Sequence, residues 1–291
     1  MNSSRNSAAA PRPRHTGNLP RTDTDTDKSQ LPAVRVAAAA DLHLRPDPPR
    51  RFRNAFREAA RHADMLLLGG DLTASGTVEQ ARMVAEDAGN LGIPVAAVLG
   101  NHDHDSRTGN KIIGVLADAG VQVLEGSGTV VTCRGVRVGI AGCKGYGGGF
   151  DGAVVHEHGE PQTRAFVRHS RDSAKRLAAA LAALDCDVKV ALTHYAPIPG
   201  TLRGEPRELY LMLGSQRLGQ VIDEAGAALA IHGHAHRGVE KGVTAGGTPV
   251  RNVAYKVIGT AYHIYTLLPP EADHTRWQIV DHGQDRSDDG S

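Results

Sequence analysis

The chain has 291 residues, a formal net charge of +1 at pH 7, and aromatic side chains at only 4% of its positions. This length is enough for one large α/β domain or two small ones, and evenly spread motifs favour one domain. A charge near zero gives no electrostatic reason for a polyanionic partner. No run of residues approaches the roughly 18 apolar positions of a membrane-spanning helix.

The cysteines and the first residues of the chain indicate the cellular compartment in which the protein is found. The three cysteines are odd in number and form no CxxC pair, which favours a reducing environment over a disulfide framework. The arginines near the start are not followed by an apolar core, so the sequence does not indicate a secretory signal. We therefore expect a cytoplasmic protein.

Composition separates one folded domain from the two ends of the chain. Residues 1–32 are rich in Ser, Pro, Arg, Thr and Asp, and predict a disordered tail. Residues 33–270 carry the motifs and are expected to form the domain. Residues 271–291 are expected to form a terminal strand and tail, largely disordered after residue 284.

The spacing of apolar residues predicts an alternation of helices and strands. Helices are expected over 49–62, 77–91, 111–119, 161–183 and 216–225. Short β-rich runs over 121–142 indicate that a second sheet begins there, and the runs 249–253 and 262–268 would complete it. The glycine-rich loop 145–150 is either a linker or a flap that faces the substrate.

Five predicted strands end directly in polar side chains, which need partners once water is excluded. They end in Asp41-Leu42-His43 after 34–40, Gly69-Gly70-Asp71 after 65–68, Gly100-Asn101-His102-Asp103 after 95–99, His194 after 188–193, and His232-Gly233-His234-Ala235-His236 after 227–231. Thirty residues separate Asp41 from Asp71, and thirty more separate Asp71 from Asn101. Each interval suits the strand–helix–strand repeat of a parallel sheet, in which ligands bind at the carboxyl edge.

Seven oxygen and nitrogen donors, with no thiolate among them, are therefore expected to meet in one crevice. That number is too large for one tetrahedral ion and suits two ions that share a carboxylate. Side chains two apart in an extended segment point the same way. The pairs Asp41/His43 and His234/His236 can each direct both donors into the crevice.

These motifs resemble, in order and without a substitution, those of the calcineurin-like metallophosphoesterases over residues 33–268. The matching residues are Asp41-x-His43, Gly70-Asp71, Gly100-Asn101-His102-Asp103, His194 and Gly233-His234-x-His236. The resemblance implies an α/β fold in which two packed mixed β-sheets are flanked by helices as a four-layer sandwich. It also implies a metal-dependent phosphoric ester hydrolase with two divalent ions.

The resemblance also assigns the ligands. Asp41, His43 and His236 would hold the first ion, Asn101, His194 and His234 would hold the second, and Asp71 would bridge the two. Mixed His, Asp and Asn ligation suits Mn, Fe, Zn, Ni or Co. Taken alone, each of these residues also has a structural interpretation, as a helix cap or a hydrogen-bonded core histidine. Strand alternation directs the neighbouring His232 away from the crevice.

By the same resemblance His102 is not a ligand. We assign it to protonation of the leaving-group oxygen or to stabilisation of the transition state, with Asp103 orienting its ring. The hypothesis is in-line attack by a metal-bridging hydroxide. Arg45, Tyr195 and Arg237 flank the ligands and are candidates for contact with the substrate.

A small phosphodiester, a nucleotide or a phosphomonoester is the leading substrate class. A nuclease is the alternative, supported by the stripe Arg50, Arg53, Arg57 and Arg61, which otherwise forms a solvated helix face. Few aromatic residues and no separate DNA-capping domain count against it. A metal-holding scaffold without catalysis is the other alternative, although every motif position is filled.

Overall fold

Two mixed β-sheets of six strands each form the centre of the computed structural model, which describes residues 30–46, 51–271 and 276–282. The first sheet contains β1 (Val34–Ala39), β2 (Met65–Gly69), β3 (Val95–Val98), β4 (Val121–Val123), β13 (His263–Leu268) and β14 (Gln278–His282). Its strand order is β14-β13-β1-β2-β3-β4, and the four strands from β1 to β4 are parallel.

The second sheet is also mixed, with a parallel centre and an antiparallel strand at each edge. It contains β5 (Ser127–Cys133), β6 (Val136–Cys143), β9 (Val188–Thr193), β10 (Leu229–His232), β11 (Lys241–Val243) and β12 (Pro249–Asn252). The order is β11-β12-β10-β9-β6-β5. A separate hairpin joins β7 (Gly149–Phe150) to β8 (Ala153–Val154).

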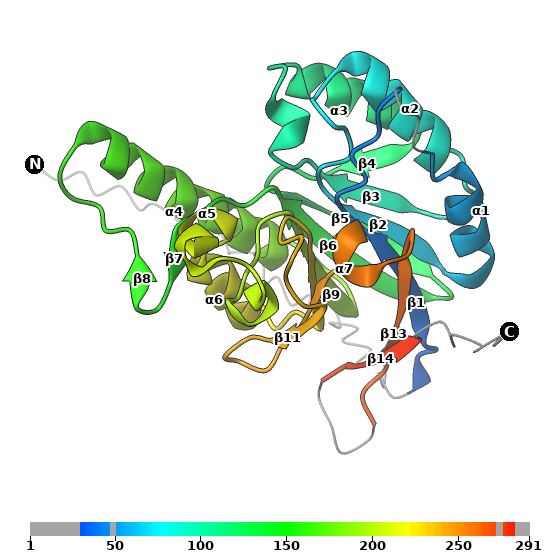
Figure 1. Ribbon diagram of the computed structural model, residues 1–291. Helices are drawn as coiled ribbons and strands as arrows, with labels where there is room; N and C mark the ends of the chain where they lie inside the picture. Colours follow the sequence, from blue (N-terminus) through cyan, green and yellow to red (C-terminus); the bar gives the residue numbers. More distant parts are fainter. Residues whose placement is uncertain (1–29, 47–50, 272–275, 283–291) are drawn as a thin grey trace, which may run out of the picture.

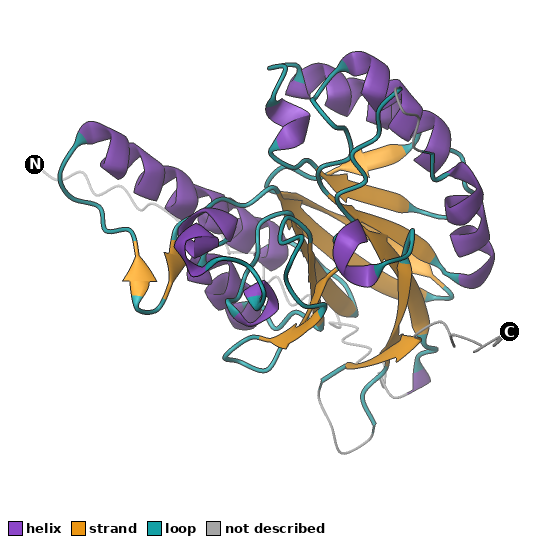
Figure 2. Cartoon of the chain, viewed as in Figure 1, coloured by secondary structure: helices purple, strands orange, loops and turns teal. Residues whose placement is uncertain are grey.

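Helices cover the outer face of each sheet, as Figures 1 and 2 show. The first sheet carries α1 (Arg53–His62), α2 (Val78–Ala88) and α3 (Gly109–Asp118), and the second carries α4 (Pro161–Ala182) and α6 (Gln216–Glu224). The short helices α5 (Tyr210–Leu213) and α7 (Tyr255–Ile258) lie in connecting loops. Thr77 caps α2, because its hydroxyl accepts a hydrogen bond from the Gln80 amide.

Strand alternation divides the core into the layers between these elements. Ala38 and Leu67 of the first sheet belong to the same buried cluster as Val190 of the second. The neighbouring side chains of the first sheet, such as Ala37 and Leu66, face α1, α2 and α3 instead. The predicted four-layer sandwich of two packed mixed sheets is confirmed.

Two strands join a different sheet from the one expected. Strand β4 pairs with β3, so the second sheet begins at β5 rather than at residue 121. Strand β13 pairs antiparallel with β1, where Tyr265 lies opposite Val36, and it does not complete the second sheet. Hydrophobic alternation reports which face of a strand is buried, but not which strand lies beside it.

The ends of the chain lie mostly outside the described residues, including 1–29 of the predicted tail and 283–291. Strand β14 falls in the predicted terminal segment and pairs with β13. Helix α1 begins at Arg53 rather than at Pro49, and residues 47–50 are outside the described part. Within the described segments, no helix combines the length and apolarity needed to cross a membrane.

Candidate metal centre

The loops that follow five parallel strands meet at one edge of the sandwich. The Asp41 amide donates to the Gly70 carbonyl at 2.9 Å, and the His43 amide donates to the Asp71 carbonyl at 3.0 Å. In the second sheet, the Gly233 amide donates to the His194 carbonyl at 3.2 Å. Backbone hydrogen bonds thus hold the donor-bearing loops side by side.

Unfavourable backbone conformations gather at these loops. Seven non-glycine residues in the described segments have positive φ, and four of them are predicted ligands: Asp41 (57°), His43 (46°), Asp71 (48°) and His234 (70°). Residues with a Cβ rarely adopt positive φ, because the conformation is strained. Backbone strain of this kind is concentrated at functional sites. The backbone itself therefore marks the same residues as the motifs.

Two motif glycines let the carboxylates approach. A Cβ at Gly100 would lie 2.0 Å from Asp71 Oδ1, and one at Gly233 would lie 2.4 Å from Asp41 Oδ2. Neither separation is compatible with a side chain. These glycines leave the space that the two carboxylates occupy.

The first predicted ion site contains a buried ring nitrogen that has no hydrogen-bond partner. Donor atoms of Asp41, His43 and His236 lie within 4.8 Å of one another. Nε2 of His43 is buried without a hydrogen-bond partner, 3.9 Å from Asp41 Oδ1 and 3.9 Å from Asp71 Oδ2. A buried nitrogen that faces two carboxylates without a partner fits a cation between them.

The second predicted site is formed by Asp71, His194 and His234, whose donor atoms also lie within 4.8 Å of one another. Nδ1 of His194 is 2.8 Å from the Gly69 carbonyl and must carry the proton of that hydrogen bond. Nε2 lies 3.1 Å from Asn101 Oδ1 and 3.4 Å from Asp71 Oδ1, so it faces the other predicted ligands of this site. This orientation by a carbonyl is typical of metal-bound histidines.

The electrostatics of the second site indicate an excess of negative potential. Burial lowers the pKa of His194, but the charge of Asp71 and its hydrogen bond outweigh burial and raise the pKa to about 9. Burial likewise opposes ionisation of Asp71, yet His194 holds its pKa below the usual range. Burial lowers the pKa of His234 to about 3. Without another cation, a proton on His194 balances the carboxylates.

His102 lies beside both sites on a short 3₁₀ helix, His102–His104. Its amide donates to Asp71 Oδ1 at 2.9 Å, and its ring centroid is 4.9 Å from that of His43. Its Nδ1 lies 3.1 Å from the Ala74 carbonyl and 3.1 Å from a carboxylate oxygen of Asp105. The ring is therefore oriented through Nδ1, which leaves Nε2 for other contacts.

Asp103 occupies a different place from the one expected, because in the 3₁₀ turn its side chain points into the core. It is fully buried, and its carboxylate accepts hydrogen bonds from the amides of Leu72, Thr73 and Gly100 and from the Thr73 hydroxyl. Asp103 thus joins the loops after β2 and β3, while Asp105 contacts the His102 ring. The contact between His102 and Asp105 could have been predicted from their i,i+3 spacing, which places two side chains on the same side of a helical turn.

The three candidates for substrate contact have different surroundings. Tyr195 is buried, and its ring centroid is 4.3 Å from that of His234, so it forms a wall of the second site. Arg45 and Arg237 are exposed, and the Arg237 amide donates to Glu205. The neighbouring His232 is buried with Nε2 2.9 Å from the Thr201 hydroxyl, away from the ligands as expected.

The arginines near α1 are engaged within the protein. Arg51 and Arg53 pair with Glu86 at 2.9 and 3.2 Å, and Arg51 also pairs with the buried Asp87. Arg61 pairs with Glu58 one turn away, and Arg50 lies outside the described residues. Part of the predicted basic stripe therefore serves helix packing.

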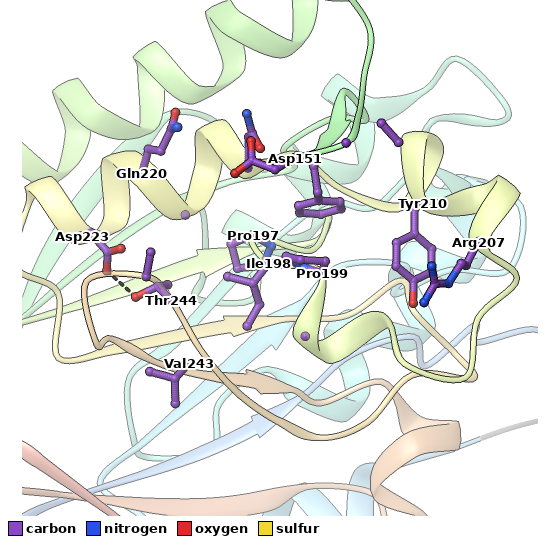
Figure 3. A pocket seen from close by; sticks show the side chains of 17 residues that line it. Asp151, Pro197, Ile198, Pro199, Arg207, Tyr210, Gln220, Asp223, Val243 and Thr244 are labelled. Atoms are coloured by element: carbon purple, nitrogen blue, oxygen red, sulfur yellow. Dashed lines mark hydrogen bonds between the residues drawn. The ribbon is translucent and has the colours of Figure 1, made fainter.

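A pocket of about 640 Å³ lies between α6 and the loops around β7, β8 and β11 (Figure 3). Its wall includes Ile198, Tyr210 and Val243, and Asp223 accepts a hydrogen bond from Thr244 there. None of the predicted ligands lines it. The candidate metal centre is thus defined by its converging donors, and none of its predicted ligands faces this pocket.

The two-sheet sandwich with Asp, Asn and His side chains at its carboxyl edge places the protein among the metallophosphoesterases, which are metal-dependent hydrolases of phosphoric esters. The chain belongs to the calcineurin-like phosphoesterase family, whose model matches residues 34–238. The family assignment and the enzyme class predicted from the sequence are confirmed.

Individual relatives are distant. A probable cyclic nucleotide phosphodiesterase of Synechococcus sp. is 35% identical over 82 residues, which cover 25% of this chain and 32% of that protein. Phosphopantetheinyl hydrolase of Mycobacterium tuberculosis is 17% identical with a TM-score of 0.56, over 76% of this chain and 89% of the other. A putative 5'-nucleotidase of Staphylococcus aureus is 12% identical with a TM-score of 0.55, over 86% and 53%. Both structures share the fold.

Proposed function

We propose that this protein hydrolyses a small phosphoester with the help of two divalent cations that share Asp71. The observation that carries the proposal is the buried Nε2 of His43, which has no hydrogen-bond partner and lies 3.9 Å from each of two carboxylates. The second cluster of donors, on the other carboxylate oxygen of Asp71, supports a second cation.

The residues present fit two such ions. Asp41, His43 and His236 would hold the first, and Asn101, His194 and His234 would hold the second, with Asp71 between them. When bound, two divalent cations neutralise the phosphoryl charge, orient the ester and make a water molecule acidic enough to attack phosphorus in line.

The protein's own groups supply the remaining steps. Because Nδ1 of His102 is held by Ala74 and Asp105, its Nε2 is the nitrogen available to protonate the departing oxygen. Its side chain is 42% exposed, so a bound ester can reach it. Asp103 keeps the loops after β2 and β3 together, which fixes Asp71 and His102 relative to each other.

Several observations favour a small substrate. The Synechococcus relative is named a probable cyclic nucleotide phosphodiesterase. Two members of the predicted stripe, Arg53 and Arg61, are paired with carboxylates, which weakens the main support for a nuclease. All the predicted ligand positions are filled and brought together, which disfavours an inactive scaffold. We retain the cytoplasm as the proposed location.

A panel of esters tests this proposal. Metal-free protein is loaded with Mn²⁺ and assayed on bis-p-nitrophenyl phosphate, p-nitrophenyl phosphate, cyclic AMP and plasmid DNA. We expect hydrolysis of at least one small ester, abolished by chelation and restored by Mn²⁺. Inactivity on every ester with each of Mn, Fe, Zn, Ni and Co would contradict the proposal, and cleavage of plasmid alone would favour a nuclease.

A further inference from the structure

Lys144 lies next to the predicted second ion site, although it belongs to none of the motifs. It directly follows β6, which pairs with β9, and its carbonyl accepts hydrogen bonds from the amides of His194 and Tyr195, each at 3.0 Å. Main-chain bonds thus fix Lys144 beside a predicted ligand at the same edge of the second sheet.

Aromatic rings determine where its side chain lies. Lys144 Nζ is 5.5 Å from the ring centroid of Tyr146 and 5.8 Å from that of Tyr195. The Tyr195 ring lies 4.3 Å from His234, and the Tyr146 ring packs against His169 of α4 at 4.4 Å. Both rings are held by other elements, so the ammonium is directed to the His234 side of the centre.

The ammonium carries a charge that no close carboxylate neutralises in the described segments. Lys144 makes no ion pair within 4.0 Å there, and its acidic neighbours act from a greater distance. These are Asp71, which the two cations would share, and Glu125, which accepts a hydrogen bond from the Leu99 amide.

His102 and Lys144 lie beside different rings of the candidate centre. The His102 ring neighbours that of His43, whereas Lys144 lies over Tyr195, whose ring packs against His234. If His102 serves the leaving group, a cation on the His234 side can contact the phosphoryl oxygens that the reaction retains. A third positive charge favours the ligand with more negative charge.

We propose that Lys144 is a substrate-binding residue that recognises the second negative charge of a dianionic phosphoryl group, so that the site favours phosphomonoesters over singly charged diesters. This inference rests on the proposed function, because it needs the metal-loaded centre. It adds a substrate class and a residue that the motifs do not supply.

The test removes the charge and measures binding as well as turnover. In the Mn²⁺-loaded Lys144→Met variant, we expect the calorimetric Kd of inorganic phosphate and the KM of p-nitrophenyl phosphate to rise about tenfold or more. The KM of bis-p-nitrophenyl phosphate, which has one charge, is expected to change by less than about threefold. Metal content should equal that of the wild type.

Matched variants separate this role from a structural one. Lys144→Arg keeps the charge and should bind phosphate within about threefold of the wild type, and Lys144→Gln repeats the charge loss if the methionine variant folds poorly. Lys175→Met, at an exposed position of α4, should leave both substrates unaffected.

The outcomes distinguish the two proposals. If the wild type takes up metal and hydrolyses esters but Lys144→Met binds phosphate as the wild type does, the role of Lys144 is wrong and the proposed function stands. An equal change for monoester and diester, or a lower melting temperature with unchanged phosphate binding, also contradicts it. Failure of the wild type to bind any cation overturns the proposed function itself.

Discussion

Several imidazoles in the candidate centre are oriented by groups that are not ligands. Nδ1 of His194 contacts the Gly69 carbonyl, Nδ1 of His102 contacts the Ala74 carbonyl, and the backbone at Met212 hydrogen-bonds His234. A hydrogen bond at one ring nitrogen fixes the tautomer and directs the other nitrogen. At the residue scale, function therefore depends on backbone carbonyls that no sequence motif records.

Replacement of His102 tests its catalytic role. His102→Ala removes the proton donor but no predicted ligand, so turnover is expected to fall by about 10²–10⁴-fold with metal content unchanged. Steady-state kinetics and metal analysis measure the two effects. His104→Ala, at the exposed neighbouring histidine, is the control. Loss of metal from His102→Ala would instead make His102 a ligand.

The two nearby aspartates should respond differently to the same change. Asp103→Asn places amide hydrogens against donors and should reduce the free energy of unfolding by about 1–3 kcal/mol. Asp105→Asn should leave stability nearly unchanged and lower kcat by up to about tenfold, because it weakens the hold on the His102 ring. Urea unfolding and kinetics distinguish them, and the reverse pattern would restore the role first predicted for Asp103.

At the scale of elements, each predicted ligand is placed by the end of a strand. Strands β1, β2 and β3 bring Asp41, Asp71 and Asn101 to one edge, and β9 and β10 bring the histidines. The motif glycines between strand and ligand are part of this geometry, since a Cβ at Gly100 would lie on the Asp71 carboxylate.

Alanine substitutions at two glycines distinguish the close approach of Asp71 to Gly100 from the general effect of replacing a glycine by alanine. Gly100→Ala is expected to lose metal binding and about 1–3 kcal/mol of unfolding free energy, because its Cβ meets Asp71 Oδ1 at 2.0 Å. Gly114→Ala, in α3 with open space around it, should gain about 0.5–1 kcal/mol. Metal binding by Gly100→Ala at wild-type strength would contradict the proposed position of Asp71.

Strand existence was predictable and strand partners were not. Apolar runs ending in Asp41, Asp71 and Asn101 indicated β1, β2 and β3, because burial on both faces leaves a continuous apolar pattern. The same apolar pattern does not predict whether β13 joins the first sheet or the second. Sequence patterns do not mark Lys144 for a related reason, since its proposed role depends on Tyr195, which the packing of the loop after β9 brings beside it.

At the scale of the whole molecule, the candidate centre spans the junction of the two sheets. Asp41 and Asp71 follow strands of the first sheet, and His194 and His234 follow strands of the second. Ion binding would therefore join both halves of the sandwich, and chelation should lower the melting temperature of the whole domain. The motif order predicted which residues meet, but only packing of the sheets brings them together.

The buried His232 predicts how stability depends on pH in the metal-free protein. Burial lowers its pKa to about 4 from an unfolded value near 6.5. The unfolded chain then binds the extra proton first, so this contribution is complete above about pH 6.5 and is lost as pH falls through about 4. The loss reaches about 3 kcal/mol.

Urea unfolding in EDTA between pH 7.5 and pH 4 measures this dependence. His232→Gln, which cannot be protonated, should show a shallower fall in unfolding free energy than the wild type. Parallel curves would show that His232 is protonated as easily in the folded chain as in the unfolded one.

Anomalous diffraction from crystals soaked in Mn²⁺ tests the central claim most directly. We predict two peaks about 3.5–4 Å apart. One should lie among Asp41, His43 and His236 and the other among Asn101, His194 and His234, with Asp71 between them. A single peak, or ions bound only elsewhere on the protein, would contradict it.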